Sequence, residues 1–234
     1  TYSAIDPSGN AATNSRTVVV RDTTAPVVSL LGAAVLTNEC HTPFADPGIE
    51  ISPVLGPMVH ATQELKPIAP PTKLPIWPSS VWVFDMGQNM VGWCRLKVSG
   101  PAGTTVQLRH AETTNTDGTL YMANLRGAQV TDRYTLRGGD TEIWQPRFTY
   151  HGFQYVELTG LPGTPGPETV TGLVLHNDTP AAGAFACSDP VLTQFGRNAQ
   201  WTQRANFVEV PTDCPQRDER LGWMGDAQAY VRTA

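Results

Sequence analysis

The sequence lacks several features that would assign it to other classes of protein. Charged residues make up only 16% of the chain, the formal net charge is −5 and no basic run occurs, so nothing in it suits a nucleic-acid backbone. Its longest apolar stretch, 25–36, is interrupted by Ser29 and Gly32 and falls short of the roughly 20 residues that a membrane span needs. We therefore predict neither a nucleic-acid partner nor a membrane span.

Paired cysteines are also missing from the sequence. Without a CxxC motif no metal framework is indicated, and we predict neither a metal nor a cofactor. We interpret each thiol as buried or lying in a loop, with one structural disulfide as the less favoured alternative. No base that could activate Cys214 is evident near it in the sequence. The four cysteines are Cys40, Cys94, Cys187 and Cys214.

An initiating Met is absent, and Thr1 already lies within a strand-like pattern. We therefore expect this chain to be a piece of a longer protein. The content of apolar residues, 40%, is typical of a globular protein and not of a disordered one. A length of 234 residues allows one large or two ordinary domains.

The most informative segment is 211–228, which reads PTDCPQRDERLGWMGDAQ. It combines four carboxylates with two guanidinium groups and one indole, and these are the groups that a sugar-cleaving site uses for proton transfer, hydroxyl binding and stacking. A solvated surface loop is the plainer alternative. Against it, Trp223 is costly to expose, Pro215 stiffens the turn, and two glycines suggest a close approach of the backbone. We predict a structured loop that runs into a helix near Asp226.

This segment resembles the catalytic-acid signature of bacterial α-L-rhamnosidases, which are inverting glycoside hydrolases with an (α/α)6 catalytic barrel. The resemblance implies that Glu219 is the general acid. It also implies that the rhamnose subsite is lined by Asp213, Arg217, Trp223 and Asp226. Asp218 and Arg220 match the signature without a role that we can assign. The chain departs from the family at Met224, where a small polar residue is usual.

The assignment of Glu219 carries a prediction about its neighbours. A general acid must hold its proton, and a nearby carboxylate raises the pKa of an acid whereas a guanidinium group lowers it. We therefore predict that Asp213 or Asp226 lies closer to the Glu219 carboxylate than Arg217 or Arg220 does. An Arg paired directly with Glu219 would argue against the acid role.

The first fifty residues have a different character. Alternating, β-branched runs at 1–5 and 11–20 flank the turn signal Asp6–Asn10 and predict a hairpin, and a third strand begins at 27. DTTAPVVSLLG and PFADPG resemble bacterial extracellular Ig-like repeats, which implies the end of one repeat at 1–24, a truncated second repeat at 25–52, and an extracellular or cell-surface location. Solvated loop acids explain Asp22, Asp46 and Glu50 better than calcium ligands do.

Residues 53–180 predict a β-sandwich. A proline-rich lead-in excludes central strands before about residue 79 but leaves an edge strand at 58–68. Short runs bounded by turn residues then follow, with a loop predicted at Asp85–Asn89. VFDMGQNMVGW, GTLYMANLRGA and RFTYHGFQYVEL resemble the concanavalin-like sandwich of rhamnosidases. The predicted strands are 81–84, 94–98, 105–110, 132–136, 153–159 and 170–176.

Several aromatic and imidazole side chains of this sandwich invite a functional interpretation that we do not favour. We predict that His151 is packed and hydrogen-bonded and that His110 and His176 have no partner at ligand spacing. Trp82, Trp93 and Trp144 are predicted to lie in the core.

Residues 181–234 change to helical periodicity. Asp189 and Pro190 form a helix start, and apolar residues recur at helical spacing to Phe207. The resemblance implies that this is the opening of the (α/α)6 domain and that the catalytic base lies beyond Ala234, so that the chain alone would be inactive. The alternative is a non-catalytic extracellular carbohydrate-binding or surface spacer protein. The predicted partner is a rhamnose-containing oligosaccharide, polysaccharide or glycoside.

Overall fold

The computed structural model describes residues 2–5, 11–14, 27–30, 49–52, 58–76, 80–181 and 183–230. The chain divides into two units, Thr1–Gly56 and Pro57–Ala234. Within the larger unit, no helix of the described residues is long and apolar enough to cross a membrane.

In the smaller unit, β1 (Tyr2–Ile5) pairs antiparallel with β2 (Ala11–Asn14), as the predicted hairpin requires. The strand predicted from residue 27 is β3 (Val27–Leu30), and it pairs with β4 (Ile49–Ser52), which the sequence pattern did not indicate. The Ig-like assignment of 1–52 stays a prediction. The turn residues 6–10, Cys40, Asp22 and Asp46 lie outside the described residues. Glu50, predicted as a loop acid, lies in β4 opposite Ser29.

The larger unit is built around one antiparallel sheet with the strand order β5-β12-β7-β11-β8-β9, to which β6 and β10 add by pairing with β7. The predicted mainly-β fold is confirmed. The sequence missed β6 and β10, which are only three residues long. The strands are β5 (Val59–Leu65), β6 (Thr72–Leu74), β7 (Val81–Val98), β8 (Thr105–Ala111), β9 (Thr131–Thr135), β10 (Glu142–Trp144), β11 (His151–Thr159) and β12 (Val170–Asn177).

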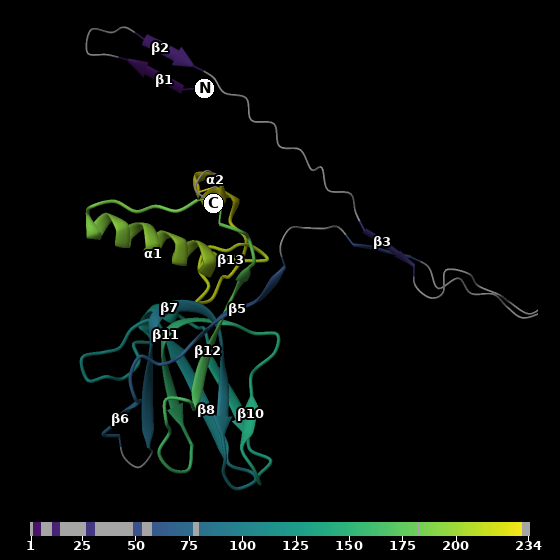
Figure 1. The fold of residues 1–234 in the computed structure, drawn as a ribbon, viewed down its shortest axis with the longest axis vertical. Helices are drawn as coiled ribbons and strands as arrows, with labels where there is room; N and C mark the ends of the chain where they lie inside the picture. Colours follow the sequence, from purple (N-terminus) through teal and green to yellow (C-terminus); the bar gives the residue numbers. More distant parts are fainter. Residues whose placement is uncertain are drawn as a thin grey trace, which may run out of the picture. The chain divides into compact units, whose positions relative to one another are not determined.

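Strand β7 organises this sheet. Its first part pairs with β11 from Val81 to Gly92, and its second part pairs with β12 from Gly92 to Leu96. Because one long strand has different neighbours along its length, the sheet curls around it, as Figure 1 shows. β5 pairs with β12 and closes one edge of the sheet, so the edge strand predicted at 58–68 is confirmed.

The prediction that a loop at Asp85–Asn89 separates two strands is wrong. β7 is continuous there, but its residues between Asp85 and Met90 bulge outward opposite the single residue Gln154. Gly87 has φ 73°, and its N–H donates to Asp85 Oδ1 at 2.7 Å. The turn chemistry of Asp85 and Gly87 was therefore recognised correctly, but it produces a bulge instead of a loop.

The apolar faces of β7, β8, β11 and β12 meet in one buried core. Trp82 belongs to it, and Trp144 packs against it with its ring stacked on Tyr134 at 5.0 Å, so the core prediction holds for both. Trp93 is only half-buried and is not among the core residues, so the prediction is not confirmed for it. Cys94 is a free buried thiol, Cys187 is a free exposed one and Cys214 is a free buried one, which removes these three from a disulfide. The core is formed by Phe84, Met86, Met90, Leu96, Val106, Leu108, Phe153, Val156, Leu158, Val170 and Val174.

A histidine pair lies within this core. His151 is buried, and its Nε2 lies 3.1 Å from both oxygens of Asp132, so the packed, hydrogen-bonded interpretation is confirmed. The prediction for His110 is wrong: its ring stacks on His151 at 4.2 Å, its Nδ1 bonds the Val130 carbonyl, and its Nε2 lies 3.9 Å from Asp132. Pairing of β8 with both β9 and β11 brings the three residues together, a contact that sequence spacing does not reveal.

The C-terminal segment begins with α1 (Pro190–Asn206), where the start predicted from sequence is confirmed. Asp189 caps the helix by accepting from Val191 N at 2.8 Å and Leu192 N at 3.4 Å, and Pro190 occupies the first turn. Figure 1 shows α1 lying across one end of the sheet, near β7. No residue of α1 is buried. The helix predicted near Asp226 is α2 (Met224–Tyr230).

Candidate active site

Most of the segment 211–228, which the sequence singled out, forms a closed loop between α1 and α2. Two short strands, β13 (Phe207–Val208) and β14 (Val210–Pro211), lead into it. Its ends are then held together by a bridge between Thr212 and Gly222, with Asp213 N donating to Leu221 O at 3.3 Å. Because these ends meet, the intervening residues project as one compact loop, called the acid loop below (residues 212–222). The predicted structured loop is confirmed.

Glu219 lies in this loop with an unusual backbone. Its φ is 99°, and the next residue, Arg220, has φ 54°. Residues with a Cβ rarely occupy this region, and each costs on the order of 1–3 kcal/mol unless the surroundings hold it. Two consecutive residues of this kind indicate that the surroundings fix the direction of the Glu219 side chain.

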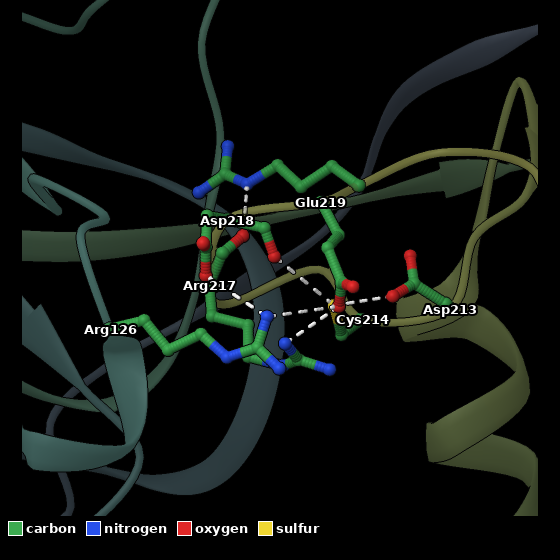
Figure 2. A network of polar contacts seen from close by, with 7 residues as sticks. Arg126, Asp213, Cys214, Arg217, Asp218 and Glu219 are labelled. Carbon is green, nitrogen blue, oxygen red and sulfur yellow. Dashed lines mark hydrogen bonds and ion pairs between the residues drawn. The ribbon is translucent and has the colours of Figure 1, made fainter.

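The prediction about the neighbours of Glu219 is wrong. Arg217 Nη1 lies 2.6 Å from Glu219 Oε2, in an ion pair whose angles do not make it a hydrogen bond. Arg126 Nη1 lies 3.5 Å from the same oxygen. The physical reason is the tight course of the loop, which places residue 217 beside residue 219, together with a long-range approach that the sequence does not show. Both guanidinium groups point at the Glu219 carboxylate in Figure 2.

Arg126 reaches the acid loop from the sandwich. It follows η1 (Ala123–Leu125), whose Leu125 is buried, and its own φ is 53°. Besides Glu219, its Nη1 lies 3.8 Å from Asp218 Oδ1. Sequence reasoning missed this residue because more than eighty positions separate it from the loop. The only signal was its place within GTLYMANLRGA, a segment that resembles the rhamnosidase sandwich.

A second carboxylate joins Glu219 through a thiol. Cys214 Sγ donates to Asp213 Oδ2 at 2.8 Å and lies 3.7 Å from Glu219 Oε2, as Figure 2 shows. Burial alone would raise the pKa of the Asp213 carboxyl, but bonds from the Cys214 thiol, from backbone N–H groups and with Glu219 hold that pKa below its ordinary value. Asp213 Oδ1 is buried without a hydrogen-bond partner among the described residues.

The other candidate residues lie farther from this cluster. Trp223 follows the acid loop; it is 47% exposed, and its backbone N–H donates to the Pro211 carbonyl. Asp226 lies exposed in the first turn of α2. Within the described part of the chain, no polar contact links either side chain to Glu219. The structure therefore brings together Asp213, Arg217 and Glu219, adds Arg126, Cys214 and Asp218, and leaves Trp223 and Asp226 at the border.

Two groups of side chains have donor atoms close enough to suggest a metal ion, with all atoms of each group within 4.8 Å. In the first, the rings of His110 and His151 are stacked only 18° from parallel, so their in-plane lone pairs do not converge on one ion. In the second, burial and the bond to Asp213 raise the pKa of Cys214 to about 11, so without a metal the thiol is protonated and donates to Asp213 Oδ2. The first arrangement does not fit a metal ion.

The acid loop therefore contains the partly exposed Glu219 carboxylate on a strained backbone, the Asp213 carboxylate with one unpaired oxygen, and the Arg217 guanidinium group, which can bind hydroxyls. Such a set can hold a sugar and transfer a proton to a departing oxygen. The half-exposed indole of Trp223 at its border offers a face for the apolar side of a sugar ring.

Comparison with known proteins points the same way. Residues 77–176 match the bacterial α-L-rhamnosidase concanavalin-like domain, and residues 180–234 match the bacterial α-L-rhamnosidase 6 hairpin glycosidase domain. An α-L-rhamnosidase from Streptomyces avermitilis is 56% identical over 154 residues, which is 66% of this chain and 15% of the relative. One from Formosa agariphila is 43% identical over 182 residues, which is 77% of this chain and 20% of the relative.

Solved structures agree with these matches. The crystal structure of Streptomyces avermitilis α-L-rhamnosidase complexed with L-rhamnose superposes with a TM-score of 0.74 and 50% identity, covering 78% of this chain and 17% of that one. The α-L-rhamnosidase of Aspergillus terreus gives a TM-score of 0.72 and 42% identity, covering 78% of this chain and 21% of that one. The chain thus spans about a fifth or less of the length of these relatives.

Proposed function

Because the chain belongs to the bacterial α-L-rhamnosidase family, we propose that its acid loop provides the proton-donating half of a site that hydrolyses terminal α-L-rhamnosides. Glu219 is the general acid, and it protonates the glycosidic oxygen as the bond to the anomeric carbon breaks. The observation that carries this proposal is the position of Glu219: a carboxylate 34% exposed, held at φ 99° in the loop that also presents Asp213 and Arg217.

The ion pair between Arg217 and Glu219 has to be reconciled with this role, because a paired guanidinium group favours the ionised carboxylate. We propose that the pair belongs to the sugar-free site. When rhamnose binds, its hydroxyls accept hydrogen bonds from Arg217, and the guanidinium group turns from Glu219 toward the sugar. Catalytic geometry often forms only in the complex, so the sugar-free distances do not exclude the acid role.

The remaining parts of the subsite follow from the positions of the side chains. On sugar binding Asp213 Oδ1 becomes accessible and accepts a sugar hydroxyl, Trp223 stacks on the ring, and Asp226 binds a hydroxyl from the start of α2. The reaction proceeds with inversion, with water activated by a second carboxylate about 6.5–9.5 Å from the acid on the opposite face of the ring. We place that base outside this chain, which would leave the isolated chain without turnover. The extracellular location stays a prediction from the Ig-like resemblance.

The test compares Glu219→Gln with Asp218→Asn in the complete enzyme that contains this chain. Asp218 is the adjacent carboxylate and contacts the same Arg126, so it is the matched control. We expect Glu219→Gln to lower kcat on an alkyl α-L-rhamnoside by about 10²–10⁴-fold and Asp218→Asn to lower it by less than about tenfold. Proton NMR of the first product should show β-L-rhamnose, the inverted anomer.

Two outcomes would contradict the proposal. Equal losses in both variants would remove the specific acid role from Glu219. Rhamnose affinity without any hydrolysis in the wild-type protein, unchanged in Glu219→Gln, would favour the carbohydrate-binding alternative.

A further inference from the structure

Arg220 is the residue of the acid loop to which the sequence assigned no role, and it is also the one most firmly attached to the sandwich. Its Nη1 donates to the Tyr150 carbonyl at 2.9 Å, and its Nε donates to the Arg217 carbonyl at 3.2 Å. Its guanidinium group also lies over the Tyr150 ring, 4.8 Å from the centroid. One side chain thus links the acid loop to itself and to the residue that precedes β11.

A second contact lies beside the first. A Cβ added to Gly152 would meet Cβ of Gln216 at 2.7 Å, its Cα at 3.0 Å and its N at 3.2 Å. The backbone of β11 and the backbone of the acid loop therefore touch, and only a glycine permits this approach. Gly152 and Gln216 add packing to the hydrogen bond from Arg220.

The support beneath these contacts is rigid. Tyr150 directly precedes β11, which pairs with both β7 and β8. The neighbouring His151 is buried and bonded to Asp132. An attachment to Tyr150 and Gly152 is therefore an attachment to a strand that is paired on both sides.

The attachment falls where the backbone needs support. Glu219 and Arg220 are the two consecutive residues of the acid loop with positive φ, and such strain persists only where other contacts hold it. If Arg220 were released, this part of the loop could relax, and the Glu219 carboxylate would lose its direction.

We infer that Arg220 is a positioning residue, which acts by seating the acid loop on Tyr150 and Gly152 of the sandwich and thereby aims Glu219. The inference deepens the proposed function, on which its catalytic meaning rests. It makes the sandwich a part of the catalytic apparatus: the sandwich holds the loop whose side chains react.

The contacts of Arg220 require an Arg and not a Lys. Two nitrogens of one planar group reach two carbonyls while its face covers an aromatic ring, and an ammonium group cannot make these contacts together. Charge alone is therefore insufficient, and Arg220→Lys should resemble Arg220→Ala more than it resembles the wild type.

The test is hydrogen–deuterium exchange of the 234-residue chain, followed by mass spectrometry. Arg220→Ala should speed the exchange of amides in 212–222 by about tenfold to a hundredfold, as expected for a lost charge-assisted bond, and should leave β7 and β11 unchanged. Gly152→Ala, a change on the sandwich side, should speed the same amides. Arg133→Ala is the matched control, because this exposed Arg bonds Gln107 on β8, and it should leave the loop unchanged.

A spectroscopic measurement separates positioning from general stability. The bonds with the Cys214 thiol and with Glu219 lower the pKa of Asp213, so Arg220→Ala should return that pKa toward its ordinary value in a carbon-13 NMR titration. In the complete enzyme, Arg220→Lys should lower kcat about tenfold or more while KM changes little, as expected for a misaimed acid.

Three results would contradict the positioning role of Arg220. The loop amides of Arg220→Ala could exchange at the wild-type rate, or Arg220→Lys could keep the wild-type exchange rate and kcat. Alternatively, the amides of β7 and β11 could exchange faster by the same factor as those of the loop. Neither the exchange measurement nor the titration requires turnover. If Glu219→Gln retains activity while Arg220→Ala speeds exchange in the loop, the proposed function fails and the positioning role of Arg220 remains. If Glu219→Gln loses activity while Arg220→Ala leaves the exchange unchanged, only the positioning role fails.

Discussion

The sandwich and the C-terminal segment of the same unit are stabilised in different ways. The sandwich has a core of large side chains such as Phe84, Phe153 and Leu158, which are 0% exposed, whereas the 17 residues of α1 include none that is buried. α1 is capped by Asp189 and packs only its half-buried Trp201 against the sandwich core, and the acid loop is held by polar contacts with the sandwich and by the close approach of Gln216 to Gly152. The acid loop therefore contacts the neighbouring sandwich through Arg220 and Gln216.

The sharpest way to test this contrast is to truncate one Phe in each region. Phe153→Ala in β11 should destabilise the sandwich by about 3–5 kcal/mol, because it opens a cavity in a filled core. Phe195→Ala in α1 should change the free energy of unfolding by less than about 0.5 kcal/mol, because this side chain is 71% exposed. Urea unfolding followed by circular dichroism measures both. Equal losses of unfolding free energy in the two variants would mean that Phe195 is buried, which contradicts the structure.

A smaller effect is expected from acid, again confined to the sandwich. Burial and the adjacent His151 lower the pKa of His110 to about 3, whereas an unfolded His has a pKa near 6.5. Between these values the unfolded chain binds the extra proton, so stability falls as the pH drops from 6.5 toward 3. Asp132, whose own pKa is also lowered in the fold, adds further loss only below about 3.8.

From pH 7 to pH 4.5 we expect the sandwich to lose about 3 kcal/mol from this source. Urea unfolding at the two pH values measures the loss, and His110→Gln should remove most of the difference. An unchanged pH dependence in that variant would mean that the proton is taken up elsewhere.

The smallest effect concerns the N-terminus of α1. Asp189→Ala removes the acceptor for Val191 N and Leu192 N and should destabilise the helix by about 1 kcal/mol, whereas Asp189→Asn should change it little. Amide exchange in residues 191–194 would show the loss, with the sandwich unaffected. If Asp189→Ala matched the wild type, the helix would be held by packing instead of by its cap.

Much of this arrangement could be predicted from sequence because it is local. The cap at Asp189 and Pro190, the acid loop and most sandwich strands follow from neighbouring residues. The bulge at 86–89 was misread because a turn signal looks the same inside a strand as between strands. Arg126, the role of Arg220 and the pair of His110 with His151 depend on contacts across many tens of residues. The position of Arg217 against Glu219 depends on loop strain, which no residue pattern encodes.

The central claim is that Glu219 protonates the leaving group, and a leaving-group series tests it most directly. The complete enzyme and its Glu219→Gln variant would be assayed on aryl α-L-rhamnosides whose phenols span a wide range of pKa. The account predicts a loss of about 10²–10⁴-fold for the poorest leaving group that shrinks steadily toward the most acidic phenol, which needs no proton. A loss of the same size across the whole series would show that Glu219 holds the substrate and does not donate the proton.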